Sequence, residues 1–203
     1  MRLTLIIFLF ASVNPFAQDQ EEVKVCFDSF KIFFMNKEAQ KALDFADNKS
    51  IEFLNRALNN TLNADSITIS KLDSFEKQLV LCTRLLSPSE GIKKMNATAL
   101  FQFYLDHNLY GTYEYIDVGE TIIENTQAKA KLVSRGKEFD FYLYFVKEKN
   151  KWKYNINSPM DIEKIKLKMI IERENITEME FILDRVRNIT EKEITKATWK
   201  PIQ

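Results

Sequence analysis

The strongest constraint on how this chain can fold is the stretch 138–146, in which apolar and polar side chains alternate. Its odd positions hold only large apolar side chains, and its even positions up to 144 hold acidic or tyrosine side chains. Because successive side chains of a strand point to opposite faces, this pattern predicts a β-strand with one face against a core. The apolar row is Phe139, Phe141, Leu143 and Phe145, and the opposite row is Glu138, Asp140, Tyr142 and Tyr144.

Shorter runs on both sides of this strand indicate an antiparallel meander. Residues 112–118 are rich in Tyr and β-branched residues, and residues 128–133 and 152–156 alternate in character. Turn sequences separate the runs at 134–137 and at 149–150. We therefore predict about four antiparallel strands between Thr112 and Ile156, with an apolar face that helices must cover.

Helical patterns precede and follow the predicted sheet. Apolar residues recur at steps of three and four, and the polar stretch 59–65 indicates a loop. The segment Ser87-Pro88-Ser89-Glu90 is a helix-start signal, which predicts one helix as far as about Asn108. The expected fold class is α+β, with N-terminal helices packed on a roughly four-stranded antiparallel meander and a C-terminal helical tail. The periodic stretches are 22–35, 43–46, 51–58, 72–86, 162–169 and 179–189, the last preceded by the capping box Thr177 to Glu180.

The N-terminus has the pattern of a secretory signal. Arg2 is followed by the apolar run Leu3–Phe10, and Ala17 offers a small residue to a signal peptidase. This run is too short to cross a bilayer, which needs about 20 apolar residues. We therefore expect an exported protein, periplasmic or extracellular, without a stable membrane anchor. The expected organisation is a signal peptide at 1–17, an α+β domain at 18–158 and a C-terminal helical extension at 159–203.

Charge and motif content argue against several classes of partner. Lys+Arg and Asp+Glu each number 29, and loss of Arg2 with the signal leaves the mature chain at about −1, so no bulk field attracts nucleic acid. The sequence contains no Gly-rich phosphate loop, nucleophile elbow or HExxH pattern. One histidine and two distant cysteines supply no familiar metal-ligand spacing. We expect no nucleic-acid partner, no cofactor and no metal.

The two cysteines leave two alternatives open. Cys26 and Cys82 lie in separate predicted helices of a chain expected to be exported. In an oxidising compartment, a disulfide between them would stabilise the fold by roughly 3 to 4 kcal/mol. The other interpretation is two buried thiols that act as small hydrophobic residues. Spacing alone does not show whether the two Cβ atoms meet.

Helices followed by a long hairpin resemble the nuclear transport factor two-like (SnoaL-like) cone fold. The residues that carry this resemblance are 27–58 as a helical lid, Phe139–Phe145 and Trp152-Lys153-Tyr154 as the hairpin, within a match from Glu21 to Ser158. The family implies a cone with a pocket between helices and sheet, which some members use for isomerase or dehydratase chemistry and others only for binding. This chain departs from the pattern in its additional helix before the sheet and in the tail from Asp161 to Ile202.

Two groups of residues are candidates for chemistry. Asp140, Tyr142 and Tyr144 share one face of the predicted strand, where a carboxylate and two phenols can line a pocket. The alternative is an ordinary half-exposed sheet surface. His107 follows Asp106, but sequence neighbours on a helix point to different sides, and a histidine near a helix C-terminus is favoured by the helix dipole alone.

Fold signals without catalytic motifs favour a binding protein. The function expected from the sequence is that of an exported, non-enzymatic protein that binds a protein partner or an apolar small molecule. The alternative is a small pocket enzyme of isomerase or dehydratase type that uses Asp140, Tyr142 or Tyr144 as acid or base.

Overall fold

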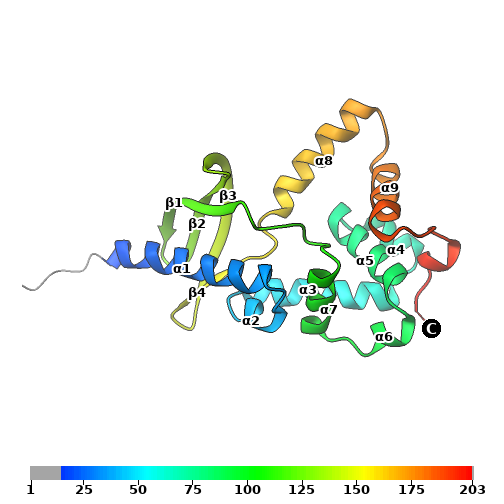
Figure 1. The fold of residues 1–203 in the computed structure, drawn as a ribbon, viewed down its shortest axis with the longest axis horizontal. Helices are drawn as coiled ribbons and strands as arrows, with labels where there is room; N and C mark the ends of the chain where they lie inside the picture. Colours follow the sequence, from blue (N-terminus) through cyan, green and yellow to red (C-terminus); the bar gives the residue numbers. More distant parts are fainter. Residues whose placement is uncertain (1–14, 203) are drawn as a thin grey trace, which may run out of the picture.

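The computed structural model describes residues 15–202, so most of the predicted signal peptide lies outside the described residues. Within that range the chain forms a sheet crossed by one long helix, with a group of helices beside it (Figure 1). The elements are α1 (Pro15–Met35), α2 (Ala39–Leu43), α3 (Asn48–Asn63), α4 (Ser66–Lys71), α5 (Ser74–Leu86), α6 (Ser89–Lys93), α7 (Ala97–Asp106), β1 (Ile116–Glu124), β2 (Gln127–Ser134), β3 (Lys137–Glu148), β4 (Lys151–Tyr154), α8 (Met160–Glu174), α9 (Glu178–Thr190) and the 3-10 helix η1 (Lys196–Trp199).

The four strands form the predicted antiparallel meander in the order β1-β2-β3-β4. Phe145, in the middle of the sheet, lies opposite Ala128 on one side and Tyr154 on the other. The β2–β3 turn has positive φ at both central residues, Arg135 at 50° and Gly136 at 72°. Tight hairpins favour this left-handed geometry because it matches the twist of the strands. The α+β class and the meander predicted from the sequence are confirmed.

An aromatic core fills the space between α1 and the sheet. Phe27 and Phe30, on the predicted apolar stripe of α1, are fully buried, and their ring centroids lie 5.3 and 4.9 Å from that of Tyr154 in β4. The hydroxyls of Tyr154 and Tyr113 are 3.2 Å apart, so each phenol has a polar partner inside the core. Side chains therefore occupy the place where the cone-fold resemblance implies a pocket.

A second core lies in the group of helices, around α5. This helix packs against α3 and α9, and it buries Leu79, Leu81 and Cys82. From its last turn Arg84 donates hydrogen bonds to the carbonyls of Asn60, Thr61 and Ala64 at the end of α3, and to that of Thr198 in η1. Burial lowers the pKa of Arg84 to about 10, so the guanidinium stays protonated at neutral pH. One cation thus joins three helical elements.

The predicted helix boundaries are wrong in two places. The loop expected at 59–65 is helical up to Asn63, because the side chain of Asn63 bonds to that of Asn59 and Arg84 satisfies the carbonyls at the helix end. The helix expected to run to about Asn108 is interrupted between Lys93 and Ala97, since the Asn96 side chain accepts a hydrogen bond from the Ala99 amide and starts a new helix.

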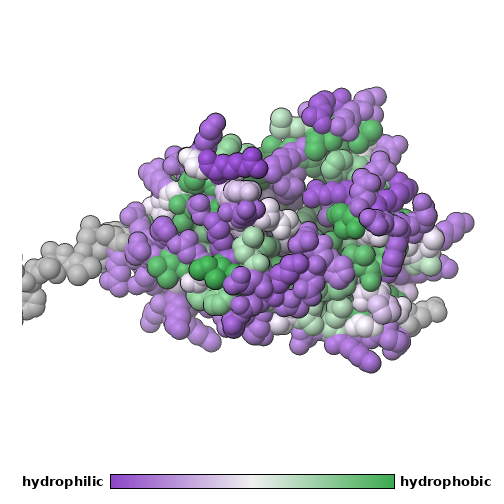
Figure 2. All heavy atoms as spheres, in the orientation of Figure 1, coloured by the Kyte–Doolittle hydropathy of each residue, from purple (hydrophilic) through white to green (hydrophobic). Residues whose placement is uncertain are grey.

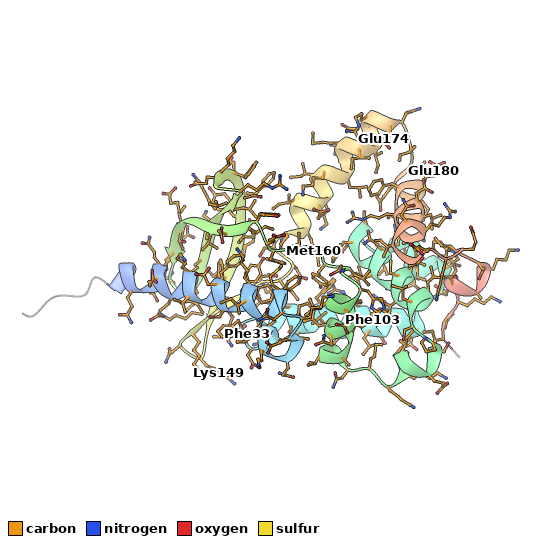
Figure 3. The ribbon with its side chains drawn as sticks, in the orientation of Figure 1. Phe33, Phe103, Lys149, Met160, Glu174 and Glu180 are labelled. Atoms are coloured by element: carbon orange, nitrogen blue, oxygen red, sulfur yellow. The ribbon has the colours of Figure 1, made fainter. Side chains whose placement is uncertain are left out.

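The C-terminal helices differ in how much of their surface packs against the rest of the molecule. Helix α9 begins at the predicted capping box of Thr177 and Glu180 and packs its buried residues, Ile182 and Val186, toward α5. Helix α8 instead extends from Met160 near the body of the molecule to Glu174 at its outer end (Figure 3). Much of α8 is exposed to solvent, whereas α9 and η1 belong to the helical core.

A charged contact joins the start of α1 to the sheet and makes stability depend on pH. Asp19 binds Lys147 (Oδ1–Nζ 2.5 Å) and accepts a hydrogen bond from Trp152 Nε1 at 3.0 Å, and these bonds lower the pKa of Asp19. A carboxylate whose folded pKa is lowered stabilises the fold above its unfolded pKa, and this contribution is lost as pH falls through the folded pKa.

We expect Asp19→Asn to lower the free energy of unfolding by about 1 kcal/mol at pH 7. The difference from the native chain should shrink below the unfolded pKa of about 4. Urea unfolding at pH 7, 5 and 3 measures it, with Asp28→Asn as the control because Asp28 pairs with Lys24 on the exposed side of α1. A difference that stays constant over this pH range would contradict the assignment.

Candidate functional site

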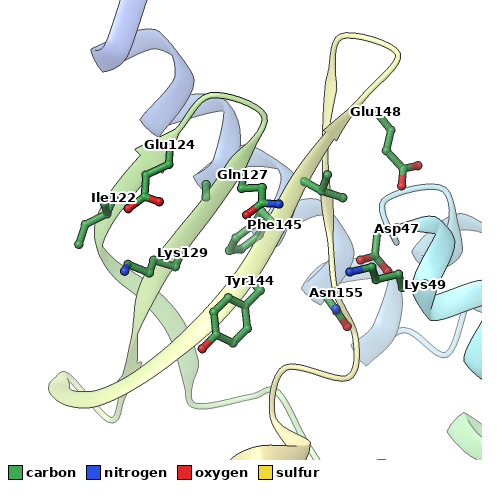
Figure 4. Close-up of a pocket in the computed structure, with 12 residues that line it drawn as sticks. Asp47, Lys49, Ile122, Glu124, Gln127, Lys129, Tyr144, Phe145, Glu148 and Asn155 are labelled. Carbon is green, nitrogen blue, oxygen red and sulfur yellow. The ribbon is translucent and has the colours of Figure 1, made fainter.

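The face of the sheet opposite α1 carries an open hollow of about 430 Å³. Figure 4 shows Tyr144 of β3 between Lys129 of β2 and Asn155 after β4. Tyr144 and Lys129 are opposite each other in the strand register, and Ile122 of β1 follows in the same row. The side chain of Tyr144 is 44% exposed, so an aromatic ring is available on this face. The remaining lining residues are Asp47, Lys49, Glu124, Gln127, Ala128, Phe145, Val146 and Glu148.

The start of α3 forms one wall of the hollow, and hydrogen bonds hold it there. Asp47 caps the helix by accepting from the Ser50 amide at 2.8 Å, and Ser50 Oγ accepts from the Ile156 amide at 3.0 Å. Glu148 of β3 accepts from the Asn48 amide at 3.1 Å. Burial raises the pKa of Asp47 despite the bonds from Ser50, which act in the opposite direction. Asp47 and Glu148 therefore have structural roles at this wall.

The side chains that give the hollow its chemical character are polar and of mixed charge. Lys49 and Glu124 are exposed and of opposite sign, and Lys129 lies 5.5 Å from the centre of the Tyr142 ring, within reach of a cation–π contact. A cavity suited to an apolar ligand is lined mainly by hydrophobic side chains with few polar groups. This hollow is instead suited to a ligand that carries its own charges and hydrogen-bonding groups.

The three candidate residues of β3 are placed differently with respect to this hollow. Tyr144 lines it, whereas Asp140 and Tyr142 lie further along the strand and are not among its lining residues. Asp140 is exposed and Tyr142 is half-buried. The strand register pairs Lys131 with Tyr142 and then Leu132 with Phe139, so Asp140 belongs to a bulge in which β3 has residues without a partner in β2.

His107 and the two cysteines, which the sequence also singles out, are not among the residues that line the hollow. His107 ends α7, where its Nδ1 lies 2.9 Å from the Phe103 carbonyl and its ring stacks near that of Phe103. Cys26 and Cys82 are free thiols, so the possible disulfide is not formed in the structure: Cys26 is in contact with the Phe45 carbonyl beside the sheet, and Cys82 is in the helical core. Burial raises the pKa of both thiols to about 12.

Sequence reasoning missed most of the lining of the hollow. The alternation over 128–133 predicts a strand but gives Lys129 no role in a site, and no sequence pattern marks Lys49. The start of α3 carries a local signal, because Asp47 precedes Ser50 at the spacing of an N-cap. Its position beside β4 depends on contacts between residues about a hundred positions apart, such as Asn48 with Glu148 and Ser50 with Ile156. No local pattern contains that information.

The described residues, 15–202, also bear on metal binding and on membrane insertion. No group of three or more His, Cys, Asp or Glu side chains there is arranged to bind a metal ion. No helix within the same residues is long and apolar enough to cross a bilayer.

Comparison with known proteins gives no family for this chain. No protein-family model matches it, and no curated protein or solved structure does.

Proposed function

We propose that this chain is an exported, non-enzymatic binding protein that holds a polypeptide partner on the open face of its sheet. The observation that carries the proposal is the hollow of about 430 Å³ around Tyr144, which is lined mainly by charged and amide side chains. An exposed tyrosine between a lysine and an asparagine suits a protein surface, because tyrosine supplies contact area at low entropic cost and charges give specificity. The same lining disfavours an apolar small molecule.

The side of the molecule that Figure 2 draws has no broad apolar surface. Figure 2 shows hydrophilic residues over most of the side of the molecule that it draws, with apolar residues in small separate patches. A broad apolar patch would instead favour an obligate hydrophobic interface. Because Lys49, Glu124 and Lys129 line the hollow, we expect an association that depends on salt and on individual charged residues.

We also infer that the architecture is a variant of the nuclear transport factor two-like cone. A long helix across one face of a twisted antiparallel meander supports this relation. The variant differs in its four strands, in the aromatic rings of Phe27, Phe30 and Tyr154 between helix and sheet, and in a hollow on the opposite face. These differences direct binding away from the site that enzymes of that family use.

Photo-crosslinking tests the proposed function. Benzoylphenylalanine in place of Lys129 should crosslink one discrete polypeptide in cells that make the protein, and the same group in place of Lys71, exposed on α4, should not. Tyr144→Ala should reduce the crosslink at least fivefold, whereas Tyr115→Ala, also an exposed tyrosine but outside the hollow, should leave it unchanged. Equal labelling from positions 129 and 71 would overturn the proposal.

A further inference from the structure

The sheet has two edges, and side chains of α1 close the one at β1. Gln20 Nε2 donates to the Thr121 carbonyl at 3.0 Å, and Lys31 Nζ donates to the Ile116 carbonyl at 2.8 Å. Backbone groups of an edge strand are otherwise ready to pair with another chain, and natural proteins block them in this way. The β1 edge is thus partly occupied by the protein itself.

The opposite edge, where β4 lies outermost, is closed at Tyr154. Tyr154 donates its amide to the Phe45 carbonyl at 2.8 Å, and its own carbonyl accepts from the Asp47 amide at 2.9 Å. This parallel contact continues the sheet by one short bridge between Ala46 and Tyr154. The segment before α3 therefore covers the end of β4.

Beyond β4 the outermost strand is β3, and the closure ends at Tyr144. The Tyr144 amide donates to Ser158 Oγ at 3.0 Å, and its carbonyl accepts from the Asn155 amide at 2.9 Å. The pairing of β4 stops at Phe145, and within residues 15–202 no strand lies beside the remaining stretch 137–143 on that side. Because backbone groups alternate in direction along a strand, the amide and carbonyl of Tyr142 point to the same open side as those of Tyr144.

The side chains of this open stretch complete its chemical description. Phe139 is 43% exposed although it belongs to the apolar row, and Phe141 is half-buried. On the other face Asp140 is exposed, while Glu138 is paired with Lys131 at 2.9 Å. The edge thus offers apolar rings on one face, an acidic group on the other and backbone hydrogen-bonding groups between them.

We propose that the open edge of β3, residues 137–143, binds an extended strand of the polypeptide partner, which adds to the sheet beside β3. This inference rests on the proposed function and specifies how the partner binds. The complementary strand has apolar residues facing Phe139 and Phe141, and lysine or arginine on the face of Asp140. Backbone hydrogen bonds supply affinity in this mode, and alternate side chains supply specificity.

The charge on this edge favours a different chain over a second copy. Antiparallel self-pairing centred on the open stretch would place two Asp140 carboxylates opposite each other, and like charges opposite each other destabilise a strand pair. A partner strand with a lysine or arginine opposite Asp140 would instead be attracted to its carboxylate.

Selection from a displayed library of random 12-residue peptides on the folded chain tests the inference. We expect the selected peptides to alternate apolar with basic residues. Their dissociation constants, measured by fluorescence anisotropy, should rise at least tenfold for Asp140→Lys and remain unchanged for Glu52→Lys, an exposed acidic residue of α3 outside both surfaces. N-methylation of one alternate set of peptide amides should abolish binding, and N-methylation of the other set should not, because only one set faces β3.

The outcomes separate this inference from the proposed function. Peptides that lose affinity with Lys129→Glu but not with Asp140→Lys would overturn strand addition and leave the hollow as the binding site. Equal effects of both N-methylated sets would also overturn strand addition. Selection of no peptide above the level found on a blank surface would overturn both proposals.

Discussion

Replacement of Tyr154 by alanine is expected to lower the free energy of unfolding by about 4 kcal/mol. The residue is fully buried, and its ring touches Phe27, Phe30 and Phe145, so truncation leaves a cavity at the centre of the contact between α1 and the sheet. Urea unfolding monitored by circular dichroism measures the change as a lower midpoint at constant slope.

Two further variants separate packing from polarity at this position. Tyr154→Phe retains the ring but leaves the Tyr113 hydroxyl without its partner, so we expect a loss of about 1 kcal/mol. Tyr144→Ala, an equal truncation on the open face, should change stability by less than about 0.5 kcal/mol. Similar losses for Tyr154→Ala and Tyr144→Ala would show that the aromatic core has been misplaced.

Substitution of Arg84 by methionine is expected to cost about 3 kcal/mol, the second large effect. Methionine fills most of the volume of the side chain but leaves the carbonyls of Thr61 and Ala64 without their donor, while the Asn60 carbonyl keeps only the Ala64 amide. A cation at a helix C-terminus also interacts favourably with the helix dipole, and that interaction is lost as well.

Lysine at position 84 gives the matched comparison. Arg84→Lys keeps the charge, but the single ammonium group of lysine cannot reach all the carbonyls that the planar guanidinium of arginine reaches. We therefore expect an intermediate loss of about 1.5 kcal/mol. Arg187→Met removes an exposed arginine that binds Asp184 on α9 and should change stability by less than about 0.5 kcal/mol. If the substitutions at 84 and 187 had equal effects, the role assigned to Arg84 would be wrong.

The parts of the fold predicted from the sequence are those that local periodicity determines. Alternation over 138–146 predicts β3 and its buried row, and Leu143 and Phe145 are indeed buried, with the Phe145 ring beside that of Phe27 in α1. The same pattern overestimated burial at Phe139, because whether a strand face is covered depends on how far α1 and its neighbours reach. The pairing of Thr177 with Glu180 placed the start of α9 because a capping box is a local structure.

Features that depend on contacts between residues far apart in the chain could not be predicted from the sequence. Residues 59–63 have a loop-like composition, and the carbonyls at the end of that helix are satisfied by Arg84, more than twenty positions away. The hollow combines the start of α3 with three strands, so its lining has no signature in any one segment. Of the three candidate site residues only Tyr144 lies in it, and strand alternation alone gave no reason to prefer it over Tyr142 or Asp140.

The contacts of the C-terminal segment also determine when the helical core can be completed during synthesis. The Ile202 amide bonds to the Leu62 carbonyl, and the Thr198 carbonyl accepts from Arg84. Chain segments emerge in order, and contacts between residues more than a hundred positions apart form only after the later residue is available. The end of α3 therefore stays incompletely bonded on a growing chain until residues 198–202 have been made.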